Sequence, residues 1–142
     1  MSFKKRAQVS FEYLAIFGVA ALMLIPLIII FASQTGTIEA DIAYAQTENA
    51  LSRIVDSAEE IYFQGHPSKK TLRVQFPKGI SDIIFMTDYL PHEIIFVLDT
   101  VDGSFNVTRQ TYAKIDGYLE TFPGSHVIVF QAFDDVVYIQ DK

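Results

Sequence analysis

The sequence FKKRAQVSFEYLAIFGVAALMLIPLIIIFA, residues 3–32, has three cations at positions 4–6, continues through a short polar segment and ends in a long apolar run. Residues 13–32 contain no charged side chain. An α-helix needs about 20 apolar residues to cross the hydrocarbon core of a bilayer. The apolar region of a secretory signal is shorter, roughly 7–15 residues. The stretch therefore predicts one transmembrane helix.

The distribution of basic residues predicts the orientation of this helix. A cluster at residues 4–6 precedes the apolar run, and the next basic residue is Arg53. Basic residues are retained on the cytoplasmic side of membranes. The N-terminus is therefore expected in the cytoplasm and residues 34–142 outside. The alternative is a secretory signal cleaved near Ala32-Ser33.

Glu12 is a lone carboxylate at the edge of the apolar run. A carboxylate at the centre of a bilayer costs about 2.5–3.5 kcal/mol, and less near the interface. Two interpretations stay open: an interfacial side chain that reaches the headgroups, or a side chain with a cationic partner inside an assembly.

Small residues recur at Ala15, Gly18 and Ala21. This spacing favours close contacts between helices, but it is also the ordinary composition of membrane helices. Pro26 predicts a mild kink.

Composition excludes several classes of function. The chain has 142 residues, no cysteine and a formal charge of −6, so thiol nucleophiles, thiolate metal sites and disulfides are excluded, and nucleic acid is not expected as a partner. The three histidines, His66, His92 and His126, lack metal-ligand spacing. No phosphate loop, nucleophile elbow or catalytic triad pattern occurs. We therefore expect a non-enzyme without catalytic residues, metal or cofactor.

Residues 4–14, KKRAQVSFEYL, resemble the class III signal peptide of archaeal type IV pilin precursors. The resemblance implies cleavage by a prepilin peptidase between Ala7 and Gln8, so that Gln8 becomes the first mature residue and Glu12 the fifth. Members of this subgroup often carry Gly where this chain has Ala7. Cleavage would remove three cations and lower the formal charge from −6 to −9.

In the pilin family the glutamate at the fifth mature position is thought to pair with the free amine of a neighbouring subunit and to set the register of assembly. The resemblance assigns these roles to Glu12 and Gln8. It also implies an assembly ATPase, a membrane platform and identical or related pilin subunits as partners. The helix that would form the filament core includes Phe11, Tyr13, Leu14, Ile16, Phe17, Gly18 and Pro26.

Helical periodicity resumes after a polar break at residues 33–37. An apolar stripe is expected at residues 38, 42, 45, 51, 54 or 55, 58, and 61 or 62, with charged residues mostly between them. Gly65 and Pro67 should end this amphipathic helix, and Gly36 is a point where the long helix could loosen.

The remaining sequence predicts strands. Period-two alternation and turn residues favour about six of them, at residues 72–76, 80–87, 93–100, 104–109, 126–132 and 136–140, with a hairpin turn at Asp102-Gly103 and another at Asp134-Asp135. Residues 110–124 are less regular. Six aromatic residues are mostly expected in the core, with a ligand-binding patch as the alternative: Phe85, Tyr89, Phe96, Phe130, Phe133 and Tyr138.

The expected fold is α+β, type IV pilin-like: a long helix with a transmembrane half and an amphipathic half, packed on an antiparallel β domain. The expected segments are a cleaved signal peptide (1–7), a transmembrane or filament-core helix (8–33), an amphipathic helix (34–65) and an extracellular head (66–142). Asn106-Val107-Thr108 is an N-glycosylation acceptor sequence if the head lies outside.

The expected function is a structural subunit of an extracellular archaeal type IV pilus-like filament. The subunit would be a single-pass membrane protein before assembly and part of the filament afterwards. The alternative is a membrane-anchored, non-polymerising module for binding or adhesion.

Overall fold

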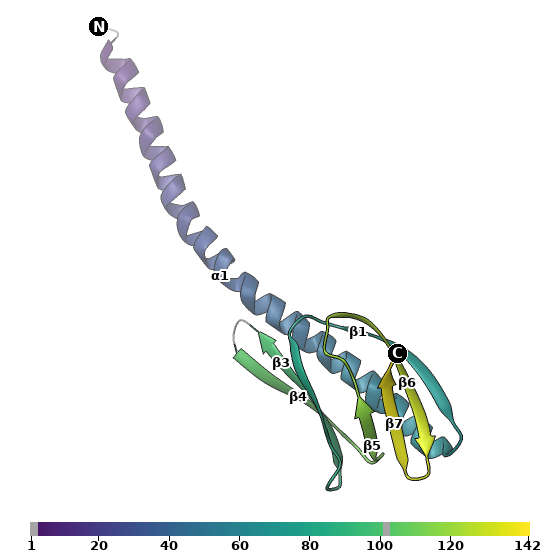
Figure 1. Cartoon of the computed structure of the whole chain (residues 1–142). Coiled ribbons are helices and arrows are strands. Elements are labelled where there is room, and N and C mark those ends of the chain that lie inside the picture. The colour runs from purple at the N-terminus through teal and green to yellow at the C-terminus, as the bar shows by residue number, and fades with distance from the viewer. Residues whose placement is uncertain (1–2, 101–102) are drawn as a thin grey trace. The chain divides into compact units, whose positions relative to one another are not determined.

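The computed structural model describes residues 3–100 and 103–142, and the side chains of residues 3–10 and 33–37 lie outside that description. These described residues form one α-helix, α1 (Phe3–Gln64), and seven strands that follow it (Figure 1). The strands are β1 (Lys69–Phe76), β2 (Ile80–Met86), β3 (His92–Thr100), β4 (Gly103–Thr111), β5 (Ile115–Tyr118), β6 (Gly124–Phe133) and β7 (Val136–Asp141). The α+β class is confirmed.

The chain divides into two compact units, Met1–Ile38 and Glu39–Lys142. The first unit is helical throughout its described part. The second unit, which we call the head, contains the rest of α1 and all seven strands. Helix α1 continues through both Pro26 and Gly36. Gly65 ends α1: its backbone has a φ of 70°, and its N–H donates to the carbonyls of Ile61 and Tyr62. Gly65 therefore acts as the helix terminator that the sequence predicts.

The strands form two sheets, one with the order β1-β6-β7-β5 and one with the order β2-β3-β4. The inner faces of both sheets and residues 50–61 of α1 share one hydrophobic cluster. Its largest fully buried side chains include Leu51, Ile54, Phe76, Phe96 and Phe130. Burial of large apolar side chains supplies about 1.5–3 kcal/mol each. This shared cluster is thus the main source of the head's stability.

The expected apolar stripe of the second half of α1 is correct only from Leu51 onward. Leu51, Ile54 and Ala58 are fully buried, whereas Ile38 and Ile42 remain more than half exposed, and Ala45 is also exposed. Among the described residues of α1, full burial begins at Thr47. The earlier apolar positions continue the helical period but are not buried.

Among the described residues the structure has seven strands where about six were expected, and one strand pair is parallel where an antiparallel arrangement was expected. A seventh strand, β5, lies in the segment that seemed irregular, and it pairs parallel with β7. Gly117 explains why this strand was missed. A Cβ on Gly117 would lie 1.9 Å from the carbonyl oxygen of Ile139, and its φ is 141°. The glycine looks like turn punctuation in the sequence, but it allows the close approach of β7.

The predicted hairpins are otherwise present. Thr100 pairs with Gly103 across β3 and β4, while Asp102 lies outside the described residues. Phe133 pairs with Val136, so Asp134 and Asp135 form the turn between β6 and β7. Of the six aromatics expected mostly in the core, Phe96 and Phe130 are fully buried, Phe85 is partly buried, and the other three are substantially exposed: Tyr89, Phe133 and Tyr138.

Candidate functional site

The apolar segment of α1 is the first candidate site. Phe11–Ala32 is long and apolar enough to cross a membrane, with a mean hydropathy of 2.9, and none of it is buried within the chain. Its large apolar side chains are 56–79% exposed on every side of the helix. A helix that is apolar all round requires burial by lipid or by other helices. Within the described residues, the chain itself supplies no such cover.

The site residues assigned by resemblance fall on this helix as expected, but their roles stay predictions. Ala7 and Gln8 belong to α1, and their side chains lie outside the described residues. Glu12 is exposed. A Cβ added to Gly18 would have no atom within 4 Å apart from its chain neighbours and the adjacent backbone of the helix. Nothing described within the chain therefore requires a glycine at position 18.

The three histidines lie in different surroundings. The Nδ1 atom of His66 lies 3.2 Å from the carbonyl oxygen of Ala132, and His92 pairs with Thr111 across β3 and β4. No group of three His, Asp or Glu side chains among the described residues is arranged to hold a metal ion.

His126 joins several segments of the head. Nothing in the sequence around it indicates this role. It is 1% exposed and lies between the rings of Phe76 and Phe122, with centroids 4.2 Å away on each side. Its Nε2 donates to the carbonyl oxygen of Phe122 at 2.7 Å, and its Nδ1 hydrogen-bonds the carboxylate of Asp141. Both polar atoms of the ring are thus satisfied, as burial requires. The contacts connect β6, the end of β7 and the loop before β6.

Two further polar contacts hold α1 against the strands. Thr111 of β4 is buried, and its hydroxyl donates to Glu59 at 2.9 Å. Lys70 of β1 forms an ion pair with Glu60, and this ammonium group lowers the pKa of the Glu60 carboxyl through a hydrogen bond and through its charge. Both side chains of that pair are solvent-accessible, so the pair contributes little to stability.

Asn106 lies on β4, at the edge of the three-stranded sheet, and both Asn106 and Thr108 are exposed. The acceptor sequence is therefore accessible in the folded head. Whether it is modified stays a prediction.

No family model, curated protein or solved structure matches this chain.

Proposed function

We propose that this chain is a pilin, the structural subunit of an extracellular archaeal type IV pilus-like filament. The observation that carries the proposal is the unburied apolar surface of Phe11–Ala32, next to a signal-like segment with Glu12 five residues after the cleavage site. An apolar helix of this length is stable in lipid before assembly. A bundle of sister helices covers the same apolar area after assembly.

The proposed mechanism has three steps. The precursor inserts with its basic cluster at residues 4–6 in the cytoplasm. A prepilin peptidase then cuts between Ala7 and Gln8 and frees the amine of Gln8. An assembly ATPase and a membrane platform finally move the helix into the filament, where sister subunits surround it and the acidic heads face solvent.

The role of Glu12 follows from the cost of an unpaired charge. In a bundle of apolar helices, a lone carboxylate is unfavourable unless it meets a cation. The free amine of Gln8 in a neighbouring subunit is the cation that cleavage creates. An amine and a carboxylate that meet in a region of low dielectric offset each other's burial only in good geometry. The pair would therefore fix the stagger between adjacent helices.

Replacement of Glu12 tests this role. We expect Glu12→Ala and Glu12→Gln to insert and to be cleaved normally, but to reduce filament yield at least tenfold, since neither side chain can pair with an amine as an ion. Electron microscopy of sheared surface filaments measures the yield, and intact mass shows whether the chain begins at Gln8. Glu48→Gln is the matched control, because Glu48 is an exposed carboxylate of the head.

Normal filaments from Glu12→Ala would contradict the register role. An uncut Met1, or an N-terminus at Ser33, would contradict the proposed processing. The non-polymerising module remains the alternative, and it predicts a cleaved, membrane-anchored chain that forms no filament even with Glu12 intact.

A further inference from the structure

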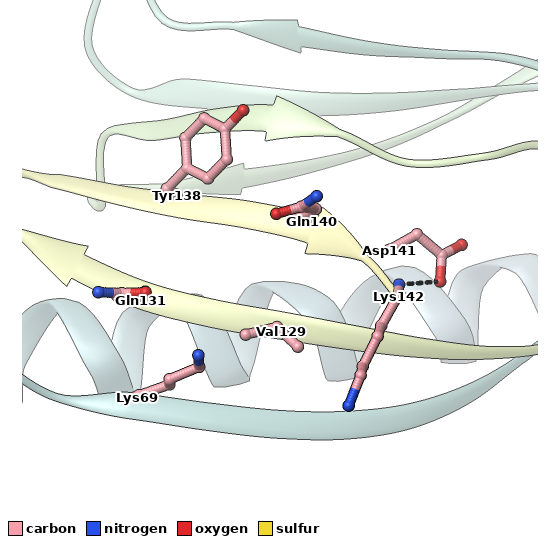
Figure 2. Close-up of a pocket in the computed structure, with 7 residues that line it drawn as sticks. All are labelled: Lys69, Val129, Gln131, Tyr138, Gln140, Asp141 and Lys142. Atoms are coloured by element: carbon pink, nitrogen blue, oxygen red, sulfur yellow. Dashed lines mark hydrogen bonds between the residues drawn. The ribbon is translucent and has the colours of Figure 1, made fainter.

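The outer face of the four-stranded sheet carries an unusual set of side chains. On β1, Lys69, Thr71 and Arg73 are exposed, while the alternate residues point toward the core. Gln131 on β6 pairs with Lys69 on one side and with Tyr138 of β7 on the other. Figure 2 shows this face with α1 behind the strands. Cations, amides and an aromatic ring therefore lie side by side on three adjacent strands.

The charge of this face is opposite to that of the chain. The formal charge of the whole chain is −6, yet Lys69, Arg73 and Lys142 lie here, and within the described residues none of the three forms an ion pair. Asp141 borders the face, but its carboxylate is already used by His126 and by the backbone N–H of Lys142. Asp116 pairs with Tyr138 and so lies on the same side of the sheet, and Asp134 and Asp135 lie beyond the face in the turn between β6 and β7. The outer side of these strands thus carries more cations than carboxylates.

A shallow pocket of about 230 Å³ lies in this face, lined by Lys69, Val129, Gln131, Tyr138, Gln140, Asp141 and Lys142 (Figure 2). It is smaller than the ~300–1,000 Å³ of sites for drug-sized ligands, and its size suits a single ring of a longer polymer. The amides of Gln131 and Gln140 can both donate and accept hydrogen bonds. Tyr138 is 43% exposed and offers a flat apolar ring with a hydroxyl group.

These groups match the chemistry of an acidic sugar. A sugar ring presents hydroxyl groups that suit the amides and an apolar C–H face that suits Tyr138 and Val129. A carboxylate on the ring would find the ammonium groups of Lys69 and Lys142. Nucleic acid fits less well, because its densely spaced phosphates require more cations than this face holds, and the acidic remainder of the chain would repel them.

We propose that the outer face of the sheet β1-β6-β7-β5 binds a carboxylated polysaccharide, with one sugar ring seated in the pocket beside Tyr138. This proposal rests on the proposed function in one respect: it requires the head to lie outside the cell. It does not require the chain to polymerise. It gives the chain a binding activity in addition to a structural role.

Binding of polygalacturonate oligomers to the full chain in detergent micelles tests the proposal. Calorimetric titration should detect binding to the acid form, and methyl-esterified oligomers of the same length should bind at least tenfold more weakly. Lys69→Gln and Lys142→Gln should each weaken binding of the acid form about threefold, as expected for exposed charge pairs, and together about tenfold. Tyr138→Ala should weaken binding about fivefold.

Lys78→Gln is the matched control. Lys78 is an exposed lysine in the turn between β1 and β2, away from the pocket, and its replacement should change binding by less than a factor of two. Thermal unfolding of each variant would verify that the head remains folded.

Three results would overturn the proposal: equal binding of the acid and the ester, binding that does not depend on Lys69 and Lys142, or tighter binding of a DNA oligonucleotide. Absence of glycan binding, together with self-association that the double lysine variant abolishes, would instead assign this face to contacts between copies of the chain. Because the titration uses unassembled chain, its failure is distinguishable from a failure to form filaments.

Discussion

His126 shows how a single residue can hold several segments of the head together. Its ring fills an apolar slot between Phe76 and Phe122, while its two nitrogen atoms reach a main-chain carbonyl and the carboxylate of Asp141. Asp141 is itself only 10% exposed at its side chain. Each member of this pair is therefore the other's side-chain partner, and each has one further contact, to the main chain.

Truncation of His126 should destabilise the head strongly. We expect His126→Ala to lower the free energy of unfolding by about 3 kcal/mol, because it leaves a cavity and a mostly buried carboxylate without its partner. Urea unfolding followed by circular dichroism measures this loss. His66→Ala is the control: His66 is exposed and makes one hydrogen bond, so its loss should cost less than about 1 kcal/mol.

A double-mutant cycle with Asp141→Ala tests the coupling between the two residues. The loss in the double variant should be smaller than the sum of the two single losses by more than about 1 kcal/mol. Additive losses would mean that His126 acts only by filling space between the two phenylalanine rings.

At the scale of elements, α1 joins two kinds of surface in one continuous helix. Residues 50–61 form a single buried face within the head, whereas residues 11–32 are apolar all round and not buried. A helix packed on one side needs only a stripe of apolar residues, but a helix surrounded by lipid or sister helices needs apolar residues on every side. The change in pattern along α1 therefore marks a change in environment.

A substitution at Gly18 tests whether the apolar segment of α1 ends up in lipid or against sister helices. A Cβ at position 18 would have no atom of another part of the chain within 4 Å, and lipid would accommodate a leucine there. We expect Gly18→Leu to insert and unfold like the wild type but to reduce filament yield at least tenfold, since small residues permit close helix contacts. Val19→Leu is the control, because it enlarges a neighbouring exposed residue that is already bulky. Normal filaments from Gly18→Leu would place Gly18 outside the helix contacts.

The elements differ in how well their sequences reveal them. The end of α1 and the presence of six of the strands follow from hydrophobic period and turn residues, which report local backbone preference and burial. Several strand ends do not: β1, for example, begins at Lys69 and not at residue 72. The short strand β5 does not, because four residues with a central Gly117 show no period and the strand depends on a distant partner, β7. Pairing between distant segments also creates the binding face proposed on the sheet β1-β6-β7-β5. Lys69 is far in sequence from Tyr138 and Lys142, and only the sheet order brings it close to them.

At the scale of the whole molecule, the two units have different sources of stability. Every residue of the shared hydrophobic cluster lies between Ala50 and Ile139. The described side chains before residue 39 contribute no buried residue. Folding of the head therefore does not require the apolar segment, while that segment requires a membrane or an assembly.

A truncated chain that begins at Glu39 tests this independence. We expect it to be water-soluble and monomeric, because it lacks the all-round apolar surface of residues 11–32. It should also unfold cooperatively, with a midpoint within about 5 °C of the head's transition in the full chain, since a loss of about 1 kcal/mol shifts the midpoint of a domain this size by 4–8 °C. Its acidic helix start should fray up to about Thr47, where full burial begins.

Calorimetry measures the unfolding of the truncated chain, and size-exclusion chromatography measures its oligomeric state. The truncated chain should neither form filaments nor block their formation by the full chain. A molten or aggregated fragment would show that residues before Glu39 contribute to the core, and filaments from the fragment would show that the heads alone can polymerise.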